Sequence, residues 1–446
     1  MYPNLYYAIK DWFGIEINAL KIFYSFGIFV AASFICAAYF LTKELKRKEK
    51  LGLLTPREEE ITVGGKASIF ELIVNGLIGF VFGYKLLGAF IASRSASIDL
   101  QEYIFSAEGS WIGGIILAGV LAFLKFREKD KQKLAEPEKR VVRIWPHDRI
   151  GDMVIFALVF GILGAKLFDN LENWDRFIKN PLGNLLSPSG LTFYGGLICA
   201  TVAISIYLVR KGISFWHAAD AFAPAMMIAY AVGRIGCQVA GDGDWGVNNS
   251  AYISDTPGHV VFANPGDYKR KLNEHALYFL EGRVPSSDST LTSVSDRRYD
   301  SLSKVPSASF RGPTFLPKWF FAYTYPHNVN EDGILLPNCE GKYCRALPQP
   351  VFPTPLYEIL MCGLLFLFLW NIRKLIKIPG YLAAIYLLLN GFERFMIEKI
   401  RVNSVYTIFG IHPTQAEIIS LLFIIAGIVL LLVLKKSKVK SEALQM

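Results

Sequence analysis

Long apolar runs, separated by short polar segments, recur along most of the chain. Each run is close to the roughly 20 residues that an α-helix needs to cross a bilayer. We expect about nine membrane spans, at residues 18–42, 67–93, 111–127, 149–170, 190–210, 215–235, 354–373, 380–400 and 415–435. The pattern therefore predicts an all-α polytopic membrane protein.

One long region breaks this pattern. Between Gly246 and Phe352 the chain is rich in Asn, Ser, Asp, Pro and Gly, with aromatic clusters among them. Such a stretch is too long for a simple connection, and its aromatic residues favour an ordered structure. We expect six membrane helices in 1–246, an extracytoplasmic head in 247–352, three further helices in 353–436, and a cytoplasmic tail in 437–446.

Composition and charge predict how the spans are oriented in the membrane. The chain is 52% hydrophobic and 14% aromatic, and its net charge is +9. Its basic residues gather in short clusters on alternate sides of successive spans: 43–48, 125–143, 210–211, 373–377 and 435–440. Short cytoplasmic loops favour Lys and Arg, so we expect the N-terminus outside and the C-terminus inside. Clusters spread in this way do not form a nucleic-acid surface.

The second and third spans resemble the fourth and fifth. Gly79 to Leu86 is similar to Gly161 to Leu167, about 82 residues later, and Trp111 to Ile115 is similar to Phe193 to Leu197 at the same offset. We expect residues 66–127 and 149–210 to be duplicated helix pairs. Chance similarity between glycine-rich helices is the alternative.

The six cysteines do not form a disulfide scaffold. Cys36, Cys199 and Cys362 lie in predicted spans and are expected to pack there. Cys339 and Cys344 lie in the predicted outer head, where a disulfide persists, so we expect them to be joined. The alternative, half of a metal site, lacks a second ligand pair, and we expect no metal.

Several ionisable or polar side chains lie at one predicted depth, near the outer ends of their spans. Ionisable residues within spans are costly and mark functional sites by default. These residues are Tyr194, Arg234, Tyr357, Glu358, Arg394 and Glu398. Arg394 and Glu398 share a helix face, either as a self-contained ion pair or as an oriented arginine. Two arginines at this depth suit the phosphate of a lipid headgroup.

Four of these segments together resemble one family. The segment from Gly233 to Gly246, preceded by Asp220, is similar to the signature of the prolipoprotein diacylglyceryl transferases. The other three segments resemble that family's His-Gly-Gly-Leu-Ile, His-Pro-x-Gln-Leu-Tyr-Glu and Arg-Phe-x-x-Glu motifs, and they are residues 193–198, 352–358 and 394–398. Phe23 and Tyr24 lie where the family has Trp-Tyr. The resemblance leaves out spans two and three and most of the head.

The resemblance implies an enzyme of the bacterial inner membrane that needs no cofactor. It would transfer a diacylglyceryl group from phosphatidylglycerol to the lipobox cysteine thiol of a prolipoprotein at the outer leaflet, releasing glycerol phosphate. Arg234 and Arg394 would hold the headgroup phosphate and stabilise the departing charge. The expected substrate-binding residues further include Tyr24, Cys237, Asp242, Asp244, Tyr357 and Glu398.

The chain departs from the family pattern at positions that matter. The family's first histidine is Tyr194 here, its second is Phe352, and its asparagine after Gly-Arg-Ile-Gly is Cys237. The family's glutamate corresponds to Asp242 or Asp244. Cys237 as a covalent nucleophile is an alternative, but no base is evident beside it.

The general base is therefore open. The candidates are Tyr194, His327, His412 or none, because a thiol with a pKa of about 8.5 ionises readily beside two arginines. Tyr194 has a catalytic role in this interpretation, although a phenol with a pKa of about 10 is a poor base.

Two other functions compete with the enzyme. A catalytically silent homologue that binds lipid or lipoprotein would explain the missing histidines. A transporter would explain the repeat, but transporter sites lie near the midplane and these charges lie at the outer end. The chain has no P-loop, no Gly-x-Ser-x-Gly elbow and no transition-metal ligand set, so ATPase, serine hydrolase and metalloenzyme functions have no support.

Overall fold

The computed structural model of the protein is mostly helical. It describes residues 1–92, 103, 106, 108–134, 136–187, 190, 192–285, 291–339, 341–403, 406 and 410–443. These residues form two compact units. Unit 1 comprises Met1–Gly14, Phe23–Phe40 and Ala219–Met446, and unit 2 comprises Ile15–Ile22 and Leu41–Ala218.

Nine long helices coincide with the nine predicted runs. They are α2 (Ser25–Lys50), α3 (Ile69–Ala92), α5 (Trp111–Lys131), α6 (Ile150–Glu172), α9 (Phe193–Arg210), α10 (Phe215–Ala240), α13 (Thr354–Ile372), α14 (Tyr381–Glu398) and α15 (Gln415–Ala443). The first prediction was wrong at its start, because Asn18–Ile22 form a separate 3-10 turn, η1. The backbone between η1 and α2 is paired with the N-terminal segment: Leu5 N donates to Phe23 O and Ser25 N to Pro3 O, at 2.9 and 3.0 Å.

Within the part of the chain that the structure describes, seven helices are long and apolar enough to cross a membrane. They span Ser25–Lys50, Ile69–Ile91, Pro146–Glu172, Phe193–Arg210, Phe215–Ala240, Thr354–Ile372 and Gln415–Lys436. The protein is therefore a multi-pass membrane protein. Helices α5 and α14 are not among the seven, so the count of nine and the orientation stay predictions.

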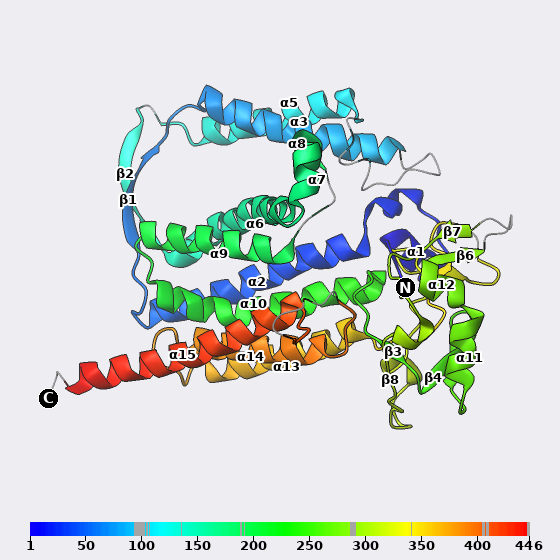
Figure 1. Ribbon diagram of the computed structural model, residues 1–446. Helices are drawn as coiled ribbons and strands as arrows, with labels where there is room; N and C mark the ends of the chain where they lie inside the picture. The colour runs from blue at the N-terminus through cyan, green and yellow to red at the C-terminus, as the bar shows by residue number, and fades with distance from the viewer. Residues whose placement is uncertain are drawn as a thin grey trace. The chain divides into compact units, whose positions relative to one another are not determined.

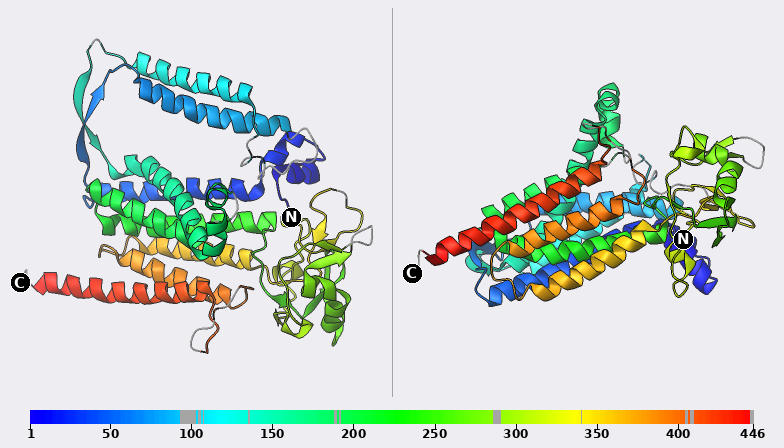
Figure 2. Two further views of the ribbon diagram at one scale, coloured as in Figure 1. Left: turned by 45° about the horizontal axis from the view of Figure 1, so that its top comes forward. Right: turned by 60° about the horizontal axis from the view of Figure 1, so that its bottom comes forward.

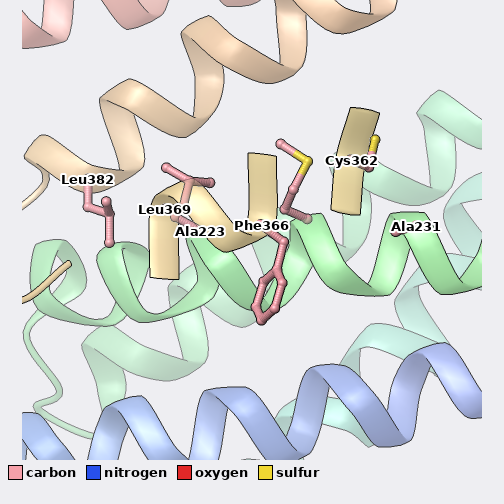
Figure 3. Packing of buried hydrophobic residues seen from close by; sticks show 7 residues of the cluster. Ala223, Ala231, Cys362, Phe366, Leu369 and Leu382 are labelled. Atoms are coloured by element: carbon pink, nitrogen blue, oxygen red, sulfur yellow. The ribbon is translucent and has the colours of Figure 1, made fainter. Parts of the chain in front are cut away.

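Helices α10, α13, α14 and α15 run side by side in unit 1 (Figures 1 and 2). Buried side chains join α10 to α13 and α14 in one cluster: Ala223, Met227, Ala231, Cys362, Phe366, Leu369 and Leu382. The larger groups from α13 and α14 face small alanines on α10 (Figure 3), as interdigitated packing requires. Helices α14 and α15 approach closely at Gly391, which has no side chain. A Cβ there would lie only 2.7 Å from Ser420 O.

A carboxylate on α10 fixes the start of α14. Asp220 is buried and accepts hydrogen bonds from the backbone N–H groups of Gly380 and Ala383, at 2.9 and 3.0 Å. The first N–H groups of a helix have no partner within the helix, and a carboxylate satisfies them and suits the helix dipole. Asp220 therefore sets the position of α14 against α10.

Unit 2 contains two tightly packed helix pairs, α3 with α5 and α6 with α9 (Figure 1). Glycines make the close approach possible in both pairs. A Cβ at Gly113 would lie 2.5 Å from Gly83 O, and one at Gly195 would lie 2.7 Å from Gly164 O. Small residues at such contacts let membrane helices approach and pack.

A lysine makes the same kind of contact in each pair. Lys85 Nζ donates to the carbonyls of Tyr103, Ser106 and Glu108, and Lys166 Nζ donates to those of Ser187 and Gly190. In both cases the ammonium group binds backbone carbonyls of residues that precede the second helix. This correspondence supports the duplication of residues 66–127 and 149–210, which stays a prediction.

A two-stranded ribbon links the helix pairs of unit 2. Strand β1 (Arg57–Val63) pairs antiparallel with β2 (Glu138–Ile144), and Glu58 opposes Arg143 with an ion pair of 2.9 Å. The turn η2 (Pro146–Arg149) then leads into α6, and the short helices α7 (Trp174–Lys179) and α8 (Pro181–Leu186) follow it.

The described residues between 247 and 352 form short elements at one end of the unit 1 helices (Figure 1). Helices α11 (Asp267–Glu274) and α12 (Ala276–Glu281) and turns η3 (Leu302–Lys304) and η4 (Lys318–Phe320) accompany the two-stranded sheets. The strands are β3 (Asn248–Asn249), β4 (Tyr252–Thr256), β5 (His259–Phe262), β6 (Arg283–Pro285), β7 (Leu291–Ser293), β8 (Ser307–Ala308), β9 (Ile334–Leu335) and β10 (Arg345–Ala346). The pairs are β3 with β8, β4 with β5, β6 with β7 and β9 with β10.

Two further contacts tie this head together. A disulfide joins Cys339 to Cys344. The N-terminal segment, which includes α1 (Leu5–Phe13), also packs here, because the Met1 amino group donates to Pro326 O at 2.8 Å. The head is thus built from the N-terminal segment and residues 247–352, which lie far apart in the sequence.

The glycine contact between α3 and α5 yields a first prediction. We expect Gly113→Ala to cost about 1–3 kcal/mol of stability, because the new methyl group collides with backbone. Gly119→Ala is the matched control, since Gly119 lies on the same helix and has nothing within 4 Å of its Cβ position. Thermal unfolding of the purified protein in detergent measures both, and equal stability of the two variants would contradict the described packing.

Candidate functional site

The end of α10 turns the chain toward the other helices. Gly241 adopts a left-handed φ of 67°, and its N–H donates to Cys237 O at 3.0 Å, which is how helices commonly terminate. Gly246 then passes so close to the end of α14 that a Cβ would lie 2.5 Å from Ile400 O. This path places Asp244 between α10 and the residues that follow α14.

A buried carboxylate, that of Glu358 on α13, lies at the centre of a charged cluster. Glu358 is 0% exposed. Its Oε2 lies 3.0 Å from Arg234 Nε of α10, and its Oε1 accepts from Arg394 Nη1 of α14, also at 3.0 Å. Tyr230 OH donates to the same Oε1 at 2.8 Å, and Arg401 Nη1 lies 3.7 Å from it. Three arginines from separate segments therefore share one carboxylate.

Asp244 forms the second bridge of the cluster. Its carboxylate contacts Arg234 through one oxygen and Arg401 through the other. Its backbone carbonyl accepts from Thr354 Oγ1 at the start of α13, at 2.5 Å. Asp244 therefore fixes the two guanidinium groups relative to each other.

Glu398 completes the cluster on α14. Its Oε2 lies 3.2 Å from Arg394 Nη2, and its Oε1 accepts from Asn403 Nδ2 at 2.6 Å. Arg394 thus contacts two carboxylates, Glu358 and Glu398. The ion pair between Arg394 and Glu398 is present, and an anion-binding role for the oriented arginine stays a prediction.

The two aspartates after α10 have different electrostatics. Burial raises the pKa of Asp242 to about 6, and the nearby Asp244 charge adds to this shift. Burial also acts to raise the pKa of Asp244, but Arg234 and Arg401 outweigh it and hold that pKa below its usual range. Asp244 is therefore the permanent anion, and Asp242 is the titrating one.

The structure brings together several of the residues that the sequence singled out. Arg234, Asp244, Arg394 and Glu398 belong to one cluster, and Cys237 Sγ lies 3.6 Å from Arg234 Nη1. Asp242 lies beside Cys237 and Asp244, since ligand atoms of all three are within 4.8 Å of one another. Their functional roles stay predictions.

Other candidates lie elsewhere. Tyr357 OH donates to Phe320 O of the head at 2.8 Å. Tyr24 precedes α2 and pairs with Asn4. His327 Nδ1 contacts Tyr343 O at 2.8 Å, and His412 lies just before α15. Tyr194 starts α9 in unit 2, so its participation stays a prediction.

Two members of the cluster were missed from the sequence, Arg401 and Tyr230. Arg401 lies seven residues after Arg394, a spacing typical of one helix face, but the predicted span ended at residue 400 and α14 ends at Glu398, before Arg401. Tyr230 lies four residues before Arg234, and its ring lies 5.2 Å from that guanidinium carbon. Helical spacing alone was the available signal for both.

The cluster sets three guanidinium groups beside three carboxylates, those of Glu358, Asp244 and Glu398. Within the described residues it brings three guanidinium groups to a mostly buried site, where their paired donors match phosphate oxygens. Cys237, Asp242 and Asp244 have a spacing that a metal ion can use, although we expected none. Because both oxygens of Asp244 contact guanidinium groups, a cation there would compete with two arginines.

Fold and site together define a helical membrane protein with a mostly buried cluster of three arginines and three carboxylates. The model of the family "Prolipoprotein diacylglyceryl transferase" matches residues 104–433, most of the chain, and the protein belongs to this family. The matched range contains the whole cluster. It also contains α5, which the sequence resemblance left out, and it starts after Tyr24.

Curated relatives carry the name phosphatidylglycerol–prolipoprotein diacylglyceryl transferase. The one from Shouchella clausii is 25% identical over 323 residues, which are 72% of this chain and 84% of that protein. The one from Bacillus cereus strain 03BB102 is 32% identical over 127 residues, 28% of this chain and 44% of that protein. A Bacillus anthracis relative matches to the same extent.

The raised pKa of Asp242 gives a pH prediction. The folded pKa of about 6 exceeds the ordinary 3.8, so the folded state binds the proton more tightly, and stability falls as pH rises from about 4 to 6. The Asp242→Asn variant has no carboxyl group to ionise at this position, so it does not lose stability in this pH range. We expect the variant to gain up to about 3 kcal/mol relative to the natural protein at pH 7.5, with a much smaller gain at pH 4. Thermal unfolding at both values measures this, and an equal difference at the two would contradict it.

Proposed function

We propose that the protein transfers the diacylglyceryl group of phosphatidylglycerol to the cysteine thiol of a prolipoprotein lipobox. The thiolate sulfur displaces glycerol phosphate from the glyceryl carbon, so a C–S bond forms and a C–O bond breaks. Membership of the family and the names of its relatives support this reaction. The arginine cluster around Glu358 is the single structural observation that carries it.

Arg234, Arg394 and Arg401 are the proposed phosphate-binding residues. A guanidinium group offers paired donors, and the charge on the leaving phosphate grows as the C–O bond breaks. Donors held in place by Glu358 and Asp244 do not reorganise during the reaction. Their orientation by these two carboxylates therefore favours the transition state over the ground state.

We place this reaction at the outer leaflet of the bacterial inner membrane. In unit 1 the cluster lies where α10 ends and α13 begins, next to the head, while α15 runs to the far end (Figure 1). The basic residues after α13 and at the end of α15 favour the cytoplasm for that far end. The head and the cluster then face outward, which agrees with the disulfide between Cys339 and Cys344.

A weak general base is enough to accept the proton of the attacking thiol. A thiol near positive charge ionises at lower pH, and three arginines lie in this cluster. We leave Tyr194, His327 and His412 as alternative bases. A non-catalytic lipid-binding or lipoprotein-binding homologue is the competing function, favoured by Tyr194 and Phe352 at the family's histidine positions.

Conservative arginine variants test the phosphate role. We expect Arg234→Lys and Arg394→Lys each to slow glycerol phosphate release about 100-fold, because a lysine cannot replace the two-pronged contact. The assay uses purified protein in nanodiscs, phosphatidylglycerol and a lipobox-cysteine peptide. Arg270→Lys, an exposed arginine of α11 in the head, is the matched control and keeps the full rate.

A peptide with serine in place of the cysteine separates the outcomes. Release by the natural protein that requires the thiol supports the transferase. Phosphatidylglycerol binding without any release would favour the non-catalytic homologue. Full release by both lysine variants would remove these arginines from the mechanism.

A further inference from the structure

A polar cavity opens on the head side of the charged cluster. Its volume is about 690 Å³, within the range of roughly 300–1,000 Å³ typical of ligand sites. Four segments of unit 1 line it: residues 242–245, 292–297, 330–332 and Arg345. Asp244 belongs to this lining and also binds Arg234 and Arg401. The cavity therefore adjoins the proposed phosphate site directly.

The basic side chains of this cavity are already engaged. Arg297 Nη2 donates to Gly243 O at 2.6 Å, and its guanidinium carbon lies 5.3 Å from the Trp245 ring centre. Arg345 Nη1 donates to Gly333 O at 3.0 Å. Arg297 thus contacts backbone and ring groups of the cavity wall and Arg345 contacts the neighbouring Gly333, which leaves fewer donors for an anion.

Acidic groups outnumber these arginines. The lining includes Asp242, Asp244, Asp296, Glu331 and Asp332. Glu331 lies 3.7 Å from Lys342, which is a loose pair, and Asp296 is exposed at the cavity edge. Even with Asp244 neutralised by its arginines, the cavity has an acidic balance. It disfavours the glycerol phosphate anion and, being polar, also disfavours acyl chains.

The acceptor substrate has a part that fits these properties. The apolar stretch of a signal peptide lies in the membrane, and the chain beyond the acceptor cysteine must continue toward water. With the thiol at the arginine cluster, the residues after the cysteine start beside Asp244. The adjoining space on the head side is this cavity.

We propose that the cavity binds the polar segment that follows the acceptor cysteine of the prolipoprotein, and that its acidic lining favours basic side chains in that segment. This inference rests on the proposed function. Hydroxyls and an amide in the lining, including Thr292, Ser293 and Asn330, supply hydrogen bonds to a peptide backbone. Asp296 supplies charge selectivity.

Two peptides that are identical up to the acceptor cysteine test this. One continues with lysines and the other with glutamates. We expect the natural protein to transfer to the lysine peptide with about five- to tenfold higher kcat/KM, the scale of one or two charge contacts near a surface. Asp296→Lys should bring the ratio of the two values to about 1 or reverse it. Glu281→Lys, the same charge reversal on an exposed head residue outside the cavity, keeps the preference.

The kcat/KM values for the two peptides distinguish a failure of this inference from a failure of the proposed function. No transfer to either peptide by the natural protein would overturn the transferase itself. Transfer at equal rates, or a preference that Asp296→Lys leaves unchanged, would overturn the cavity's role alone. Fluorescence anisotropy of the labelled peptides with the same variants gives a second readout, in which the binding preference must follow the kinetic one.

Discussion

The carboxylate of Glu358 is the constraint on which the site depends. It is completely buried, and it contacts Arg234, Tyr230 and Arg394 closely and Arg401 more loosely. A buried charge is costly without partners, and removing one partner of such a pair costs about 3–5 kcal/mol. Helices α10 and α14 are therefore held against α13 at this level by charge as well as by apolar packing.

This arrangement links stability to chemistry. An arginine that turned away would lose its contact with Glu358 or Asp244, which favours one orientation of its donors. A phosphate that reaches them meets preorganised charge. The supports lie outside the cluster, in Asp220 at the start of α14 and in the glycine turns that bring Asp244 back to Arg401. The site is thus formed by residues at the ends of several helices rather than by one sequence motif.

The helices were predictable because an apolar run of membrane length has few alternatives to a helix. The start of α2 was not, since it depends on pairing with residues 3–5, and no local pattern encodes that contact. The head was expected as a region but not as a fold. Strand β3 pairs with β8 across a long separation, Asn248 with Ser307, and no local pattern encodes that contact.

The candidate site was predicted in part for the same reason. Arg234, Arg394 and Glu398 lie in recognisable segments at one depth, so the sequence indicated them. Arg401 lies beyond its predicted span and reaches the cluster through its bridge with Gly246. Tyr357 shares that depth, yet its hydroxyl turns to the head, because depth along a helix does not fix the direction of a side chain.

The transfer rate of Glu358→Gln tests the central claim most directly. Glutamine keeps the shape and an oxygen for Tyr230 but removes the charge that orients the arginines. We predict a folded protein with a lower melting temperature and about 100-fold slower glycerol phosphate release, since misplacing reacting groups by about 1 Å costs that much. Release at the natural rate by the folded variant would contradict the claim that this carboxylate organises the site.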